Sequence, residues 1–137
     1  MKILFDTCVI IDVLQSREPF CADGQKLFTA VAEGKIKGFI TANSVTDIFY
    51  LTHRALHDNK KAKEILGTLF EFFAIIDTTA GDCHNALHSP VADFEDAVVC
   101  ACAEREKIDY IVTRNIKDYK NAQAVKALTP KELTEKI

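Results

Sequence analysis

The sequence has no tryptophan, only three prolines and five glycines in 137 residues, and no stretch where such residues gather into a linker. No repeat or low-complexity segment interrupts it. A chain of this length fits one domain, so we expect a single domain over residues 1–137. With 48% hydrophobic and 27% charged residues, the composition is typical of an ordinary globular protein.

An export signal and paired cysteines are also missing. The first apolar run ends at Asp6, far short of a signal peptide or a membrane span, so we expect no association with a membrane. The five cysteines are odd in number and form no Cys-x-x-Cys motif. These observations predict reduced thiols and a cytoplasmic location.

Positive charge is not in excess, because the formal net charge is -3. This balance argues against a protein that coats nucleic acid, which is usually basic. It does not exclude a nuclease, since acidic residues gathered in one cleft leave room for positive charge elsewhere on the surface.

Short β-like runs alternate with helical segments along the chain. The expected strands cover residues 2–5, 36–41, 74–77, 110–113 and 124–128. The expected helices cover residues 8–14, 19–34, 43–57, 60–72 and 79–89, with two more starting at Asp93 and Pro130. The alternation predicts a parallel sheet with helices on both faces, which binds its ligands at the carboxyl ends of the strands.

Polar residues follow two of the expected strands at that edge. Asp6 and Thr7 come directly after the first strand. Thr113, Arg114 and Asn115 end the strand over residues 110–113 and begin the loop after it. Because the carboxyl ends of parallel strands meet at one edge of a sheet, we expect these two groups to lie close together.

Expected helices add further carboxylates near this edge. Asp47 lies one turn into the helix after the second strand, and Asp93, Glu95 and Asp96 lie at the start of the helix before the fourth strand. Asp93 and Asp96 are spaced to share a helix face, whereas Glu95 is rotated away. Acidic residues are also common as helix caps, which is the plain alternative for Asp93 and Asp96. Asp118 is more simply explained as a turn residue.

Carboxylates confined to a small volume raise each other's pKa values, and a divalent cation relieves that repulsion. Hard oxygen ligands favour Mg²⁺ or Mn²⁺. Such an ion activates water and neutralises charge on a phosphate, so the pattern predicts hydrolysis of a phosphodiester.

Four segments together resemble the PIN domain family, and in particular the short VapC-type toxins of toxin–antitoxin pairs. The segments are Ile3–Thr7, the region around Asp12, Asp93–Ala97 and Tyr110–Tyr119. The resemblance implies a three-layer α/β/α sandwich with a central, mostly parallel sheet of four to five strands. It also implies a Mg²⁺- or Mn²⁺-dependent endoribonuclease, a homodimer and an antitoxin partner with a helical segment lying in a groove.

Site residues carry over from this resemblance position by position. Asp6, Asp47 and Asp96 match the metal ligands, with Asp93 assisting. Thr113 and Asn115 match the polar pair after the fourth strand; Thr7 and Arg114 are candidates for contact with substrate. The family usually has Glu at the second position, where this chain has Asp47, and often an acid where it has Asn115. The missing charge predicts one firmly bound ion.

Three other interpretations start from the same sequence. The departures at Asp47 and Asn115 suit an inactive PIN-like module that binds RNA or assembles with partners. A flavodoxin-like signalling domain is disfavoured by the lack of a lysine after the last strand. The pairs His53/His57 and His84/His88 have helical spacing, but two ligands do not make a structural zinc site.

Overall fold

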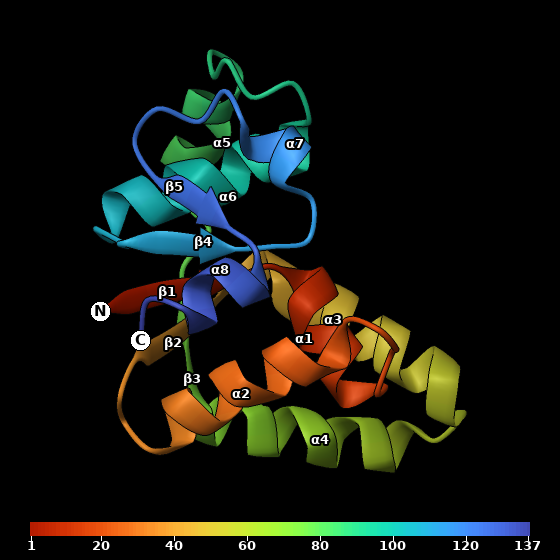
Figure 1. Cartoon of the computed structure of the whole chain (residues 1–137). Helices are drawn as coiled ribbons and strands as arrows, with labels where there is room; N and C mark the ends of the chain where they lie inside the picture. Colours follow the sequence, from red (N-terminus) through yellow and green to blue (C-terminus); the bar gives the residue numbers. More distant parts are fainter.

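Five parallel strands form the centre of the computed structural model, which describes residues 1–137 (Figure 1). The strands are β1 (Lys2–Phe5), β2 (Lys37–Thr41), β3 (Phe73–Ile76), β4 (Tyr110–Val112) and β5 (Lys126–Leu128). They pair in the order β3-β2-β1-β4-β5, and every neighbouring pair is parallel. The predicted α/β/α sandwich is confirmed, and its sheet is entirely parallel.

Eight helices cover the two faces of the sheet. They are α1 (Thr7–Leu14), α2 (Cys21–Ala32), α3 (Ala42–Leu56), α4 (Asn59–Phe72), α5 (Ala80–Ala86), α6 (Phe94–Arg105), α7 (Ile116–Tyr119) and α8 (Pro130–Thr134). Helices α1 to α4 gather below the sheet in Figure 1, whereas α5, α6 and α7 lie above it. None of the eight has the length and apolarity needed to cross a lipid bilayer.

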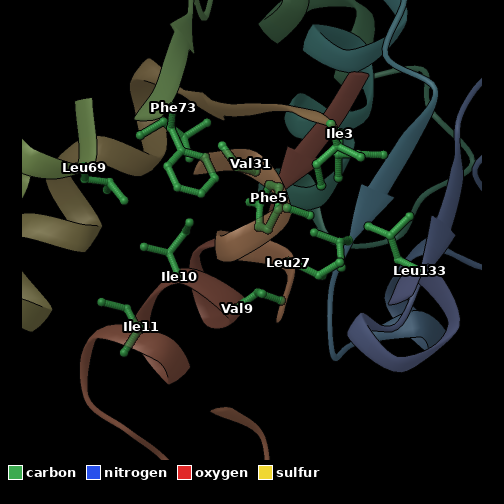
Figure 2. Packing of buried hydrophobic residues seen from close by; sticks show 14 of the residues in the cluster. Ile3, Phe5, Val9, Ile10, Ile11, Leu27, Val31, Leu69, Phe73 and Leu133 are labelled. Carbon is green, nitrogen blue, oxygen red and sulfur yellow. The ribbon is translucent and has the colours of Figure 1, made fainter. Parts of the chain in front are cut away.

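The buried strands point alternate side chains into two cores, one on each face of the sheet. Ile3 and Phe5 of β1 enter the core under α1 to α4, and Leu4 enters the core under α5 and α6. The ring of Phe5 packs edge-on against Phe73, with centroids 4.9 Å apart, and Figure 2 shows Leu27 of α2 in the same cluster. Each such side chain, when fully buried, stabilises the fold by about 1.5–3 kcal/mol.

The strand order places a switch point between β1 and β4. From β1 the chain crosses to β2 and then β3 on one side, and it later returns to place β4 on the other side. Ligands of such sheets bind where the strand order reverses, outside the carboxyl ends. The flavodoxin-like order is 2-1-3-4-5, so the alternative of a flavodoxin-like signalling domain is wrong.

Several element boundaries differ from those expected. Helix α3 begins earlier than predicted, because Thr41 caps it by accepting the Ser44 N–H at 3.1 Å. The short helix α7 was not predicted, since four residues are too few to show a helical period. The stop at Gly34 is confirmed: its φ of 73° is a left-handed conformation that glycine adopts without strain.

Candidate active site

Asp6 lies at the switch point, where β1 ends and α1 begins. Its backbone N–H donates to the carbonyl of Val112 at 3.0 Å, which ties the ends of β1 and β4 together. Although Asp6 is the N-cap residue of α1, its side chain makes no capping hydrogen bond. Instead, its Oδ2 accepts the hydroxyl of Thr113 at 2.7 Å. Burial raises the pKa of Asp6, and this hydrogen bond opposes the rise.

Thr113 is itself held in place. It is fully buried, and its Oγ1 accepts the backbone N–H of Asn115 at 3.0 Å while its hydroxyl donates to Asp6. The thiol of Cys8 lies 3.7 Å from both Asp6 Oδ2 and Thr113 Oγ1. The predicted meeting of Asp6 with Thr113 and Asn115 is therefore present. Sequence reasoning missed Cys8, because it was read only as one of five reduced thiols.

Asp96 lies beside Asp6, at the start of α6. Its Oδ1 accepts the hydroxyl of the buried Tyr119 at 3.0 Å. Burial raises the pKa of Asp96 to about 6; the Tyr119 hydrogen bond opposes this, and the charges of Asp6, Asp93 and Asp118 add to it. Asp96 thus occupies a crowded negative site. Tyr119 could not have been placed there from sequence, because it comes from the unpredicted helix α7.

Asp93 has the capping role that the sequence left open. It precedes α6 with an extended backbone, and its Oδ1 accepts the N–H of Asp96 at 3.0 Å. Asp93 is therefore outside the helix, so the argument that it shares a helix face with Asp96 does not hold. Its charge nevertheless contributes to the rise in the pKa of Asp96.

Glu95 lies in the first turn of α6 and is exposed, as expected for a charge at a helix start. Burial raises the pKa of Glu95, and the negative charges of Asp47, Asp93 and Asp6 raise it further. Glu95 is therefore electrostatically coupled to the site carboxylates. Asp47 of α3 contributes to the raised pKa of Glu95, and its role as a metal ligand stays a prediction.

Asp118 also belongs to this neighbourhood. It lies in α7, and its charge adds to the rise in the pKa of Asp6 and of Asp96. The turn-residue interpretation is therefore incomplete, because the α7 turn brings its carboxylate back toward the end of β1.

Arg114 is anchored at the mouth of the site by Asp12, a buried residue of α1. Arg114 Nε lies 2.5 Å from Asp12 Oδ2, and the guanidinium lies 4.2 Å from the centre of the Phe20 ring. A second arginine, Arg17, approaches the same carboxylate at 4.0 Å. The ion pair between Arg114 and Asp12 fixes the loop after β4 to α1, and this loop also carries Thr113. This role is separate from any contact that Arg114 makes with substrate.

The model that describes the PIN domain family matches residues 2–117 of this sequence. The chain belongs to the PIN domain family. A search of curated protein sequences finds no match.

Solved structures share the whole fold of this PIN domain. A chain of VapBC2 from Rickettsia felis, bound to a DNA fragment from the promoter, superposes with a TM-score of 0.71 at 14% identity, over 94% of this chain and 98% of that one. A chain of a toxin–antitoxin complex from Klebsiella pneumoniae superposes with a TM-score of 0.68 at 19% identity, over 93% of this chain and 97% of that one. A chain of DNA-bound VapBC from Salmonella typhimurium superposes with a TM-score of 0.67 at 13% identity, over 95% of this chain and 98% of that one.

The chemistry of the PIN-domain site suits a hard divalent cation. The carboxylates of Asp6, Glu95 and Asp96 all have raised pKa values, and each pKa is raised in part by a neighbouring acid. A cation would relieve this repulsion. In the conformation described, no three acidic, histidine or cysteine side chains converge on one point, so ligation requires some of them to rotate.

Neither histidine pair belongs to a group of side chains that could hold a metal ion. His57 follows the end of α3 with a left-handed φ of 51°, and His53 stacks on Phe49. Helix α5 ends at Ala86, so His88 is outside the helix that carries His84. The sequence spacing therefore does not translate into two imidazoles on one helix face.

Proposed function

We propose that this PIN domain is a divalent-metal-dependent endoribonuclease that hydrolyses RNA phosphodiester bonds and acts in the cytoplasm as the toxin of a type II toxin–antitoxin pair. The observation that carries the proposal is the hydrogen bond between Asp6 and Thr113 at the switch point, with the other site acids grouped around it. Membership of the PIN family and the fold of the toxin–antitoxin structures support it.

Each side chain has a role in this proposal. Asp6, Asp47 and Asp96 hold Mg²⁺ or Mn²⁺, which when bound supplies an activated water and neutralises charge on the phosphate. Thr113, fixed by the Asn115 backbone, and Tyr119 orient the carboxylates of Asp6 and Asp96.

The acids and polar groups around those ligands complete the site. Asp93 assists by capping α6, and Glu95, which sequence reasoning set aside, is a further carboxylate available to accept a proton. Thr7 and Arg114 border the path of the RNA. Asn115 occupies a position where the family often has an acid, and the absence of that negative charge favours a single bound ion.

Asp6→Asn tests the site directly. The substitution keeps the size of the side chain and removes its charge, so we expect magnesium-dependent cleavage of RNA to products with a 5′-phosphate to be lost while the fold survives. Cleavage is followed on gels, and folding by circular dichroism. The matched control is Asp109→Asn, at the opposite edge of the sheet, where the carboxylate accepts the backbone N–H of Lys2. Cleavage by Asp6→Asn at the wild-type rate contradicts the assignment.

The alternative is a PIN domain that has lost catalysis and serves to bind RNA or to assemble with partners. It is motivated by the shorter acid at Asp47 and the uncharged Asn115. Calorimetric titration with Mn²⁺ separates the two functions. No binding in the micromolar-to-millimolar range favours the inactive module, whereas binding that Asp6→Asn weakens favours the nuclease.

The proposed antitoxin has a candidate docking surface, which we call the α2–α4 groove. The groove has a volume of about 770 Å³ and is mostly apolar. Its lining residues are Leu14, Phe28, Thr29, Ala32, Leu56, Lys61, Glu64, Ile65, Thr68, Leu69, Phe72 and Phe73. An amphipathic helix of the partner buries its apolar face in such a groove. We further propose that the chain forms a homodimer.

A further inference from the structure

A second cavity opens beside the carboxylate site and has a different chemical character. It has a volume of about 320 Å³ and lies between the start of α2, the loop after β4 and the start of α8. Its lining residues are Pro19, Phe20, Asp23, Arg114, Asn115, Thr129, Pro130 and Lys131. We propose that this cavity is a subsite for one nucleotide of the single-stranded RNA that flanks the scissile bond. The proposal rests on the proposed ribonuclease function and names how its substrate is held.

The cavity is connected to the catalytic acids by a short chain of contacts. Asn115 lines the cavity, and its backbone N–H donates to Thr113, whose hydroxyl donates to Asp6. An RNA strand that places a phosphate at Asp6 therefore has an adjacent nucleotide within reach of the cavity.

Phe20 supplies an unusual surface for this position. Its side chain is 43% exposed and belongs to neither hydrophobic core. The Arg114 guanidinium lies 4.2 Å from the centre of its ring. Arg114 covers one face of this ring, so an unpaired base would stack on the other face, and stacking tolerates any base because every base has a π face.

The charges around the cavity favour a phosphate. Asp23 is paired with Lys26 at 2.8 Å and Arg114 is paired with Asp12, so these pairs nearly cancel. Lys131 forms no ion pair and lines the cavity. Among the lining residues it is therefore the one charge without an ion-pair partner, and a lysine contact to phosphate strengthens RNA binding in a salt-dependent way.

The walls of the cavity are held by the fold. Leu133 of α8 is fully buried in the same core as Leu27 of α2, so α8 and α2 are packed together. Asp12 holds Arg114 from below through its buried carboxylate. A nucleotide would therefore enter a largely preformed site, which lowers the ordering cost of binding.

The test measures binding of a fluorescein-labelled, random-sequence single-stranded oligoribonucleotide by anisotropy, in EDTA so that no cleavage occurs. Phe20→Leu keeps an apolar side chain but removes the ring, and we expect the Kd to rise about 5- to 150-fold. Phe20→Tyr keeps the ring and should bind like the wild type. Phe70→Leu is the matched control, because Phe70 is 41% exposed but lies on α4, away from the cavity.

Lys131→Gln should weaken binding and lower the slope of log Kd against log salt by about 0.7, as expected for one lost phosphate contact on a single strand. Lys107→Gln, just before β4 at the amino end of the sheet, should change neither quantity. Equal affinity of Phe20→Leu and Phe70→Leu overturns the subsite, as does a wild-type chain that binds no RNA. Phe20-dependent binding without metal-dependent cleavage would instead retain the subsite and refute the nuclease.

Discussion

At the scale of single residues, the raised pKa of Asp96 shows that the site disfavours the ionised form of its own carboxylates. Burial is the largest cause of its raised pKa, and neighbouring acids add to it although Tyr119 donates a hydrogen bond. A carboxylate in such a position lowers the free energy of unfolding at neutral pH. The protein therefore sacrifices stability at the residues proposed to bind metal, as functional sites often do.

We predict that Asp96→Asn stabilises the chain near pH 7 by about 1–2 kcal/mol, a value reduced for partial exposure. The folded pKa of about 6 lies above the ordinary 3.8, so the folded chain keeps a proton that the unfolded chain loses. Stability consequently falls as pH rises through this window, and the advantage of the variant should vanish below about pH 4. Urea unfolding in EDTA at several pH values measures this, with Asp109→Asn as the control. A variant less stable than the wild type at neutral pH contradicts it.

At the scale of elements, the position of α6 matters because its amino end carries Glu95 and Asp96. Arg105 at the other end of α6 clamps the helix to α5 through Asp82. The buried Asp82 carboxylate accepts from Arg105 Nε at 3.1 Å and from the Thr79 N–H at 2.9 Å, which completes the capping box of α5. Although burial opposes ionisation, these hydrogen bonds lower the pKa of Asp82 to about 2.

Asp82→Asn should therefore cost about 2 kcal/mol of stability near neutral pH. Because the folded pKa of Asp82 is depressed to about 2, its contribution is complete above about pH 4 and is lost as pH falls through the folded value. Acid unfolding curves of the wild type and the variant should converge at low pH. The exposed i,i+3 pair of Asp23 with Lys26 provides a control, since Asp23→Asn should cost less than about 0.5 kcal/mol. An equal loss in both variants would argue against the clamp.

At the scale of the whole molecule, two surfaces of different character lie apart. The site carboxylates and the cavity lined by Phe20 are at the carboxyl edge of the sheet, whereas the α2–α4 groove is formed mostly by helices on one face. Phe72, 49% exposed, lines the groove, and Phe70 on the same helix is 41% exposed but does not line it. This pair allows docking to be tested separately from catalysis.

We predict that the chain alone has the mass of a dimer and that it forms a larger complex when coexpressed with the protein encoded beside its gene. Phe72→Glu should abolish that complex because it places a charge in the apolar groove, whereas Phe70→Glu should retain it. Both variants should still cleave RNA. Light scattering after size-exclusion chromatography gives the masses. Identical complexes from both variants would remove the groove as the docking surface.

The sequence by itself determined the architecture, and it singled out Asp6 as the central acid of the candidate site. Alternating apolar runs and helical periods, with caps such as Thr79 and Thr129, are local signals, and they predicted the parallel sheet and most helices correctly. Asp6 was identifiable because a strand visibly ends at it, and the rule for the carboxyl edge then predicted its meeting with Thr113.

Only the tertiary structure decided which other side chains join Asp6. Tyr119 enters the site because the short helix α7 turns back over the sheet, and four residues are too few to show a local pattern. The Asp12–Arg114 pair joins residues about a hundred positions apart, and the Phe20 cavity needs three separate elements to close around it. Such contacts depend on how helices pack, which no single stretch of the sequence encodes.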